Sequence, residues 1–127
     1  MAATNLYERQ EPKYAMFDLG PSNIGSNGYT ITIPRGAQTC DMAAETVTAF
    51  DGTGTVTLSI ADGTTTFVSA EDIKTTGVEA VDRTVKFYPD GGTITVSIAD
   101  ANSNSAAGRV VGYIAYIQLG NGTSIQE

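Results

Sequence analysis

The side chains that could do chemistry in this chain are fourteen carboxylates and a single cysteine, because its 127 residues include no histidine. Without histidine, Ser-His-Asp and Cys-His catalysis and the usual zinc sites are excluded. Cys40 would need a neighbour that lowers the pKa of its thiol, and the nearest basic residue in sequence is Arg35. We therefore interpret Cys40 as a small buried or half-buried residue and not as a nucleophile.

The carboxylates could in principle supply an acid and a base for glycoside cleavage. No local motif selects such a pair, and four of the aspartates lie beside glycine or at the end of a predicted strand: Asp51, Asp62, Asp90 and Asp100. Turn geometry explains these positions, because aspartate bonds its own backbone in turns. A calcium site is the weaker alternative, since no stretch follows the D-x-[DN]-x-[DN]-G pattern. We expect no catalytic residue, no cofactor and no metal site, and therefore no enzyme.

Composition excludes several classes of partner. The net charge of −7 argues against nucleic acid, whose phosphates attract Lys and Arg. The glycine-rich stretch at 20–28 lacks the Lys-Ser/Thr of a phosphate loop. No apolar run approaches the roughly 18 residues that a membrane helix needs. The start, MAATNLYERQ, has no apolar signal-peptide region, so we expect a soluble protein made in the cytoplasm.

Two segments of nearly identical sequence, which we call the two phrases, indicate the strands that form the centre of the fold. TVTLSIADGT occupies 55–64 and TITVSIADAN occupies 93–102. Their alternation is typical of half-buried strands, with aliphatic side chains pointing one way. The two inward rows are Val56, Leu58, Ile60 and Ile94, Val96, Ile98. We expect two equivalent strands, one in each sheet of a sandwich.

Other strands are predicted by alternation between turn signals, at 14–19, 29–33, 46–50, 65–69, 84–88 and 109–119, the last with a bend at Gly112. Within 109–119, Tyr113 and Tyr116 lie on opposite faces, which places one in the core and the other at a surface or interface. The stretch 69–81 is the single helical candidate, because Ser69 and Asp72 resemble a capping box. The sequence therefore predicts an all-β fold, a single jelly-roll-like β-sandwich with at most one short helix near 70–76.

The two ends of the chain differ from its centre. Residues 1–13 lack alternation, so we expect an N-terminal arm over 1–13, a sandwich domain over 14–120 and a polar tail over 121–127. The arm is either frayed or ordered on a neighbouring chain. In the second case its interface residues are Leu6, Tyr7, Glu8, Arg9 and Lys13, with the first two as apolar anchors.

Residues 31–77 and 93–120 resemble a class of small structural proteins of tailed bacteriophages. The motifs that carry the resemblance are IPRGA (33–37), VTAFDG (47–52), TLSIADG (57–63), AEDI (70–73) and the small-residue loop before the last predicted strand. They consist mostly of strand ends and turns. Residues 1–28 lie outside the resemblance.

The resemblance implies a capsid decoration or cement protein on the surface of the virion, without catalytic residues. It implies the major capsid protein as partner and a homo-oligomer, usually a trimer. The low share of charged residues, 17%, agrees with a virion structural protein better than with a metabolic enzyme. A tail or baseplate part, or a glycan-binding module that recognises the host, is the alternative.

Overall fold

The computed structural model describes residues 12–25 and 28–118, and strands dominate this part of the chain. A 3₁₀ turn, η1 (Pro21–Asn23), lies between the first two strands. The strands are β1 (Lys13–Leu19), β2 (Tyr29–Ile33), β3 (Ala37–Thr48), β4 (Val56–Ala61), β5 (Thr66–Asp72), β6 (Gly77–Asp82), β7 (Phe87–Tyr88), β8 (Gly92–Asp100) and β9 (Arg109–Gln118).

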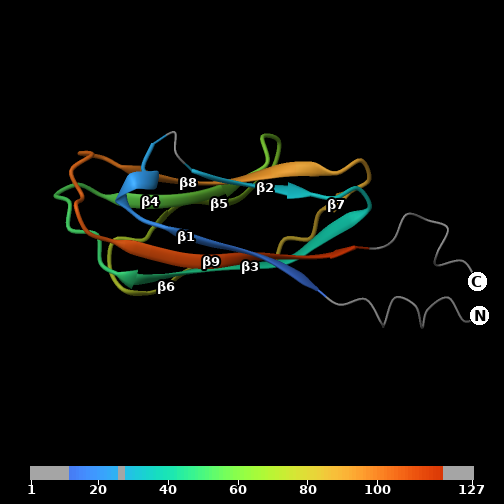
Figure 1. Cartoon of the computed structure of the whole chain (residues 1–127), viewed down its shortest axis with the longest axis horizontal. Coiled ribbons are helices and arrows are strands. Elements are labelled where there is room, and N and C mark those ends of the chain that lie inside the picture. The colour runs from blue at the N-terminus through green and yellow to red at the C-terminus, as the bar shows by residue number, and fades with distance from the viewer. Residues whose placement is uncertain (1–11, 26–27, 119–127) are drawn as a thin grey trace, which may run out of the picture.

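The strands form two antiparallel sheets that pack face to face. Sheet A has the order β1-β9-β3-β6, with the short β7 paired to the start of β3, and sheet B has the order β2-β8-β4-β5. Figure 1 shows the two sheets as the layers of an elongated sandwich. The all-β sandwich predicted from the sequence is confirmed. The described part of the chain contains no helix long and apolar enough to cross a membrane.

The strand pairs are nested along the chain. Strand β4 pairs with β5, β3 with β6, β2 with β8 and β1 with β9, as in one long hairpin that has been rolled up. Rolling adds the pairs β4–β8 and β3–β9, which become the centres of the two sheets. The two similar phrases therefore lie side by side in sheet B, and the expectation of one in each sheet was wrong.

The inward rows of those two phrases form the centre of the core, as predicted. Leu58 lies opposite Ile98 and Ile60 opposite Val96 in the β4–β8 register. All six side chains are at most 2% exposed. Sheet A adds Phe17, Met42 and other apolar residues from its inner face to the same cluster.

The short helix predicted near 70–76 does not form. Residues 66–72 belong to β5, and 77–82 belong to β6 at the edge of the other sheet. Pairing with β4 gives this segment the backbone hydrogen bonds that a capped helix turn would otherwise provide. The pairing is irregular at Ala70, which has a positive φ of 47°, and there the Ala70 amide donates a hydrogen bond to Ser59 Oγ. Local propensity for a helix turn is overridden because Phe67, Val68 and Ile73 are buried in the core.

Strand β3 is much longer than the 46–50 prediction, and it ends before Phe50. The register against β9 shifts between Thr39 and Asp41, which makes Cys40 the extra residue of a bulge. The bulge breaks the alternation, since Thr39 and Met42 are both buried, and this concealed the strand in the sequence. The strand predicted at 84–88 is limited to Phe87–Tyr88.

Gly112 does not mark a bend in β9, where its register with β1 and β3 is continuous on both sides. A Cβ at this position would lie 2.3 Å from the Ala43 carbonyl oxygen and 2.4 Å from the Phe17 ring. Glycine is needed here because the Phe17 ring and a neighbouring backbone approach β9 too closely for any side chain.

Candidate functional site: the outer face of sheet A

The strand register of sheet A places four apolar side chains in one row on its outer surface. Met16 of β1 lies opposite Tyr113 of β9, Tyr113 opposite Ala43 of β3, and Ala43 opposite Val81 of β6. Directly opposed residues in antiparallel strands point to the same side of the sheet. We call the outward side chains of sheet A the A face.

The A face holds most of the large apolar side chains that the described residues leave exposed. These exposed side chains are Tyr14, Met16, Tyr29, Val47, Val78, Val81, Val85 and Phe87. Five of them belong to the A face, because their strand partners place Tyr14, Met16, Val78, Val81 and Phe87 there. A shallow depression at its centre is lined by Met16, Tyr113, Val78, Val111, Ala43, Ala44, Gly112 and Glu45. In general, contiguous exposed apolar patches mark interaction sites, which makes the A face the candidate site of this chain.

Tyr113 is held rigidly at the middle of this surface. Its ring packs edge-on against Tyr14, with the ring centroids 5.4 Å apart and the planes at 72°. Its hydroxyl donates a hydrogen bond to Asp41 Oδ2 at 3.1 Å, and this bond raises the pKa of the Tyr113 phenol. Tyr116 packs against the core instead, so the prediction that the two tyrosines divide between core and surface is confirmed.

Charged side chains flank the apolar row on both sides. Arg109 donates two hydrogen bonds to the Asp18 carboxylate, at 3.0 and 2.8 Å, and these bonds lower the pKa of Asp18. On the other side Arg83 lies 3.7 Å from Asp41. Both pairs are exposed enough to hold orientation more than to add stability. They enclose the apolar row with groups that already have partners.

The outer face of sheet B, which we call the B face, is different in kind. Its side chains on β4 and β8 are small: Thr57, Ser59, Ala61, Thr93, Thr95, Ser97 and Ala99. The adjacent β2 presents Thr30 and Thr32, which lie opposite Thr95 and Thr93. The exposed Tyr29 at the start of β2 lies opposite the buried Val96 and so belongs to the inner side of the sheet. Such a surface offers hydroxyl groups but little apolar area.

Of the four aspartates assigned to turns, Asp62 and Asp100 accept amides of their own turns, and Asp51 joins a distant loop. Asp51 Oδ1 accepts the amides of Ala106 and Ala107 at 2.7 and 3.0 Å, and these bonds lower its pKa. Asp100 accepts the amides of Asn102, Ser103 and Ser105. Both therefore bind the loop that leads into β9. Within residues 12–25 and 28–118, no group of three or more His, Cys, Asp or Glu side chains could hold a metal ion.

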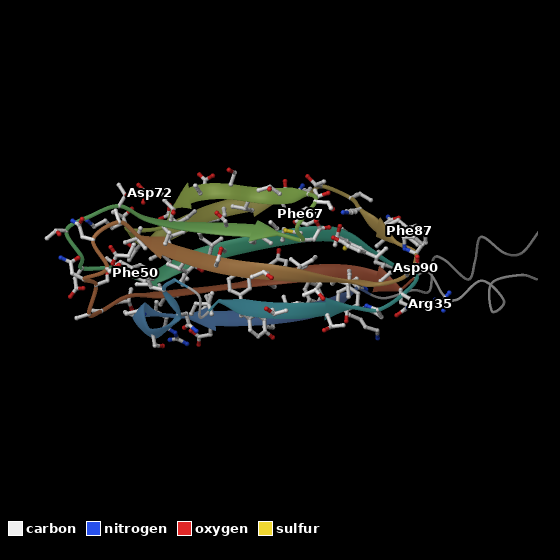
Figure 2. The ribbon with its side chains drawn as sticks, turned by 90° about the horizontal axis from the view of Figure 1, so that it is seen from above. Arg35, Phe50, Phe67, Asp72, Phe87 and Asp90 are labelled. Carbon is white, nitrogen blue, oxygen red and sulfur yellow. The ribbon has the colours of Figure 1, made fainter. Side chains whose placement is uncertain are left out.

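Asp62 connects the two sheets at the opposite end. Its carboxylate accepts the backbone amides of Thr64 and Thr65, and its Oδ2 accepts Lys86 Nζ at 2.5 Å and the Tyr88 hydroxyl at 2.8 Å. Burial raises the pKa of Asp62, but the hydrogen bond from Lys86 and the backbone amides outweigh it and leave the pKa well below its ordinary range. Figure 2 shows Phe87, Asp90 and Arg35 at this end of the sandwich and Phe50 and Asp72 at the other.

Cys40 is half-buried in the bulge of β3, as the sequence predicted. Burial, and then the charge of Asp41, raise the pKa of its thiol. A raised pKa keeps the sulfur protonated, so the thiol is a poor nucleophile.

Of the interface residues predicted in the N-terminal arm, Leu6, Tyr7, Glu8 and Arg9 lie outside the described residues. Lys13 is the first residue of β1 and pairs with Tyr116, so β1 includes the last residue assigned to the arm. Apart from Tyr113, which the sequence offered with Tyr116 as a residue of a surface or interface, the residues of the A face were not selected from the sequence. A signal was present, since YAMFDL (14–19) and RVVGYIAYIQL (109–119) are apolar at both parities, which indicates a strand covered on both faces.

Comparison with solved structures reveals similarity to two chains from bacteriophage capsids. One is a chain of the cyanophage Pam1 capsid asymmetric unit, with a TM-score of 0.63, 21% identity and coverage of 85% of each chain. The other is a chain of the acid-stable capsid of Helicobacter pylori bacteriophage KHP30, with a TM-score of 0.55, 11% identity, and coverage of 87% of this chain and 94% of that one. The chain shares the fold of these capsid chains. No family model and no curated protein matches it.

Proposed function

We propose that this protein is a structural component of a phage virion, and that it binds the exterior of the assembled capsid as a decoration or cement protein. The observation that supports this most is the shared fold, which extends over most of this chain and most of two chains from phage capsids. The nested strand order of the two sheets corresponds to a jelly roll, an architecture used by viral capsid domains.

The surface chemistry supports a binding role. The A face is apolar at its centre and lined with paired charges, the arrangement found in protein interfaces. The carboxylates of the described residues that have many partners, such as Asp51, Asp62 and Asp100, bind the protein's own loops and are occupied. We propose that the chain carries no reaction and stabilises a shell by contact.

In this proposal the chain bridges neighbouring major capsid proteins as a homo-oligomer, most simply a trimer, after synthesis in the host cytoplasm. The bridging segment is the N-terminal arm, with Leu6 and Tyr7 as anchors and Glu8, Arg9 and Lys13 as polar contacts. Many copies on one lattice bind more strongly than a single copy, because each attachment raises the effective concentration of the next contact.

The test is to add the purified full-length chain to purified capsids that lack it and to locate it by electron cryomicroscopy. A variant without residues 1–11 keeps β1 whole and separates the arm from the sandwich. We expect the full-length chain to decorate the capsid exterior, and the shortened variant to keep its thermal unfolding transition while losing occupancy. Equal occupancy of the capsid by both forms would reject the arm as the bridging segment. Density for the chain at the tail, or no density for it on the capsid, would reject decoration.

A host-glycan-binding role is the second candidate, because Tyr14 and Tyr113 form an aromatic pair on one exposed face. Sugars stack on such surfaces. A glycan array and an adsorption-blocking assay with the purified chain test this role. Binding to a defined glycan together with blocked adsorption would favour it over decoration, and no binding in either assay would remove it.

A further inference from the structure

The A face is nearly neutral although the chain is strongly acidic. Its outward charged side chains are three carboxylates, Asp18, Asp41 and Glu45, and two guanidinium groups, Arg83 and Arg109. Two positive and three negative charges give a net charge of −1 on this face, whereas the described residues together hold 11 acidic and 6 basic side chains, a net charge of −5. Four of these five net negative charges therefore lie elsewhere on the described part of the chain.

This distribution determines where two copies can meet. Like charges brought together across an interface cost several kcal/mol in general, which makes most surfaces of an acidic chain repel a second copy. The A face avoids this cost, because Asp18 is bonded to Arg109 and Asp41 lies beside Arg83 and accepts the Tyr113 hydroxyl. It also offers the largest group of exposed apolar side chains among the described residues.

We propose that the A face is the surface through which a second copy of this chain binds. Met16, Tyr113, Val78 and Val81 form the buried centre of the contact. The Asp18–Arg109 and Asp41–Arg83 pairs form its rim, where they stay partnered within their own copy. Tyrosine, methionine and arginine are the residues enriched in such interfaces. This inference deepens the proposed function, from which it takes only that several copies act together on one particle. It does not take over the number three, because a contact between two A faces joins copies in pairs.

The experiment measures the mass of the full-length chain and its variants by sedimentation velocity over a range of concentrations. Met16→Lys and Val78→Lys each place a charge in the centre of the A face, at side chains that are 65% and 68% exposed in the single chain. Thr30→Lys is the matched control, because Thr30 is an exposed residue of the edge strand β2 and lies opposite Thr95 on the B face. Lysine makes each variant less acidic, so general repulsion between copies decreases in all three.

We expect the unaltered chain and Thr30→Lys to form the same oligomer. We expect Met16→Lys and Val78→Lys to dissociate to monomers, with self-association at least about tenfold weaker, since each places a long charged side chain in an apolar contact. Glu45 is the strand partner of Val78 and could pair with a lysine there, so Met16→Lys is the stronger of the two tests. Circular dichroism identifies a variant that fails to fold, in which case the other variant decides. An unaltered chain that is monomeric at its highest soluble concentration, or folded A-face variants with wild-type mass, would overturn the inference.

Capsid binding, measured in parallel, separates this inference from the proposed function. Folded A-face variants that keep the wild-type mass but lose capsid binding would place the capsid protein on this face, which overturns the inference and leaves decoration standing. If the unaltered chain binds no capsid and the A-face variants become monomeric, the result would support the inference and reject decoration. Monomeric variants whose capsid occupancy falls would support both, because avidity is lost with the oligomer.

Discussion

The A face and the B face are built by the same kind of strand, yet they expose different chemistry. Along β8 of sheet B, inward aliphatic residues alternate with outward threonine, serine and alanine. Along β1 and β9 of sheet A, the outward positions carry Tyr14, Met16, Val111 and Tyr113 instead. Both sheets bury their inner faces equally well, so the difference cannot come from the needs of folding. The apolar outward side chains of the A face are the reason why we propose that another chain covers it, whereas the small polar side chains of the B face suit contact with water.

The largest effect should come from the inner rows that both sheets share. Leu58→Ala removes a fully buried side chain at the centre of the core and should lower the free energy of unfolding by about 2–5 kcal/mol. Met16→Ala removes a side chain of similar size from the A face and should change it by less than about 0.5 kcal/mol. Urea unfolding of both variants, at a concentration where the protein is monomeric, checks this. Equal losses would mean that Met16 supports the fold, and the contrast between the faces would then fail.

The next largest effect should come from Gly112, which lies beneath Phe17. Gly112→Ala adds a Cβ that would lie 2.3 Å from the Ala43 carbonyl oxygen and 2.4 Å from the Phe17 ring, and it should destabilise the chain by about 1–3 kcal/mol. Ser97→Thr adds one methyl group on the B face and serves as the control, with an expected change below about 0.5 kcal/mol. Thermal unfolding of the two variants measures the difference. A neutral Gly112→Ala would show that β1 can move away from β9, so that the A face is not a rigid surface.

Asp62 tests whether the two sheets need a charged link to stay aligned. Its pKa is lowered in the folded state, so its contribution to stability is complete above its unfolded pKa near 3.8 and decreases as the pH falls below that value. Asp62→Asn should cost about 2 kcal/mol at neutral pH, because the bonds from Lys86 and Tyr88 lose a charged acceptor. It should also flatten the acid limb of a plot of stability against pH. An unchanged acid limb would assign acid sensitivity to other carboxylates.

The smallest effect should come from Glu45, the carboxylate of the A face for which the described residues provide no ion pair. Burial of an unpaired carboxylate against a second copy is unfavourable, so Glu45→Gln should strengthen self-association by less than about tenfold. Glu71→Gln removes an equal charge from β5 and is the control for net charge. Sedimentation equilibrium of the two variants compares them. Equal strengthening by both would show that total charge, and not the A face, controls association.

Residues whose environment repeats along a strand were predicted well. The aliphatic rows of β4 and β8 alternate regularly, and the strands at 14–19 and 29–33 end at Gly20 and Pro34, so both burial and boundaries followed from local pattern. Long-range competition caused the errors. Ser69 and Asp72 have the spacing of a helix cap, but β4 provides backbone partners that a local pattern does not reveal. The bulge at Cys40 arises from the pairing of β3 with β9, and it interrupts the alternation by which β3 could have been predicted.

The candidate site was not predicted because its residues are mostly apolar and carry no chemical motif. Aspartates were recognised as turn residues, and their further bonds to distant loops, such as Asp51 to Ala107, depend on loop positions set by tertiary packing. The A face depends on register, since Met16, Ala43 and Val81 are far apart in sequence and meet only when β1, β9, β3 and β6 are aligned. The available signal was that 14–19 and 109–119 carry apolar residues at both odd and even positions, so that both faces of these strands are apolar.

By itself, the sequence determined that the chain forms a β-sandwich with an aliphatic core and without histidine chemistry, because alternation and composition act over a few neighbouring residues. The tertiary structure alone decided that the two similar phrases lie side by side, that Asp62 links the sheets, and that one outer face is apolar and nearly neutral. These features depend on which strands pair and in what register. Pairing is settled by the collective packing of the core, and no short segment contains that information.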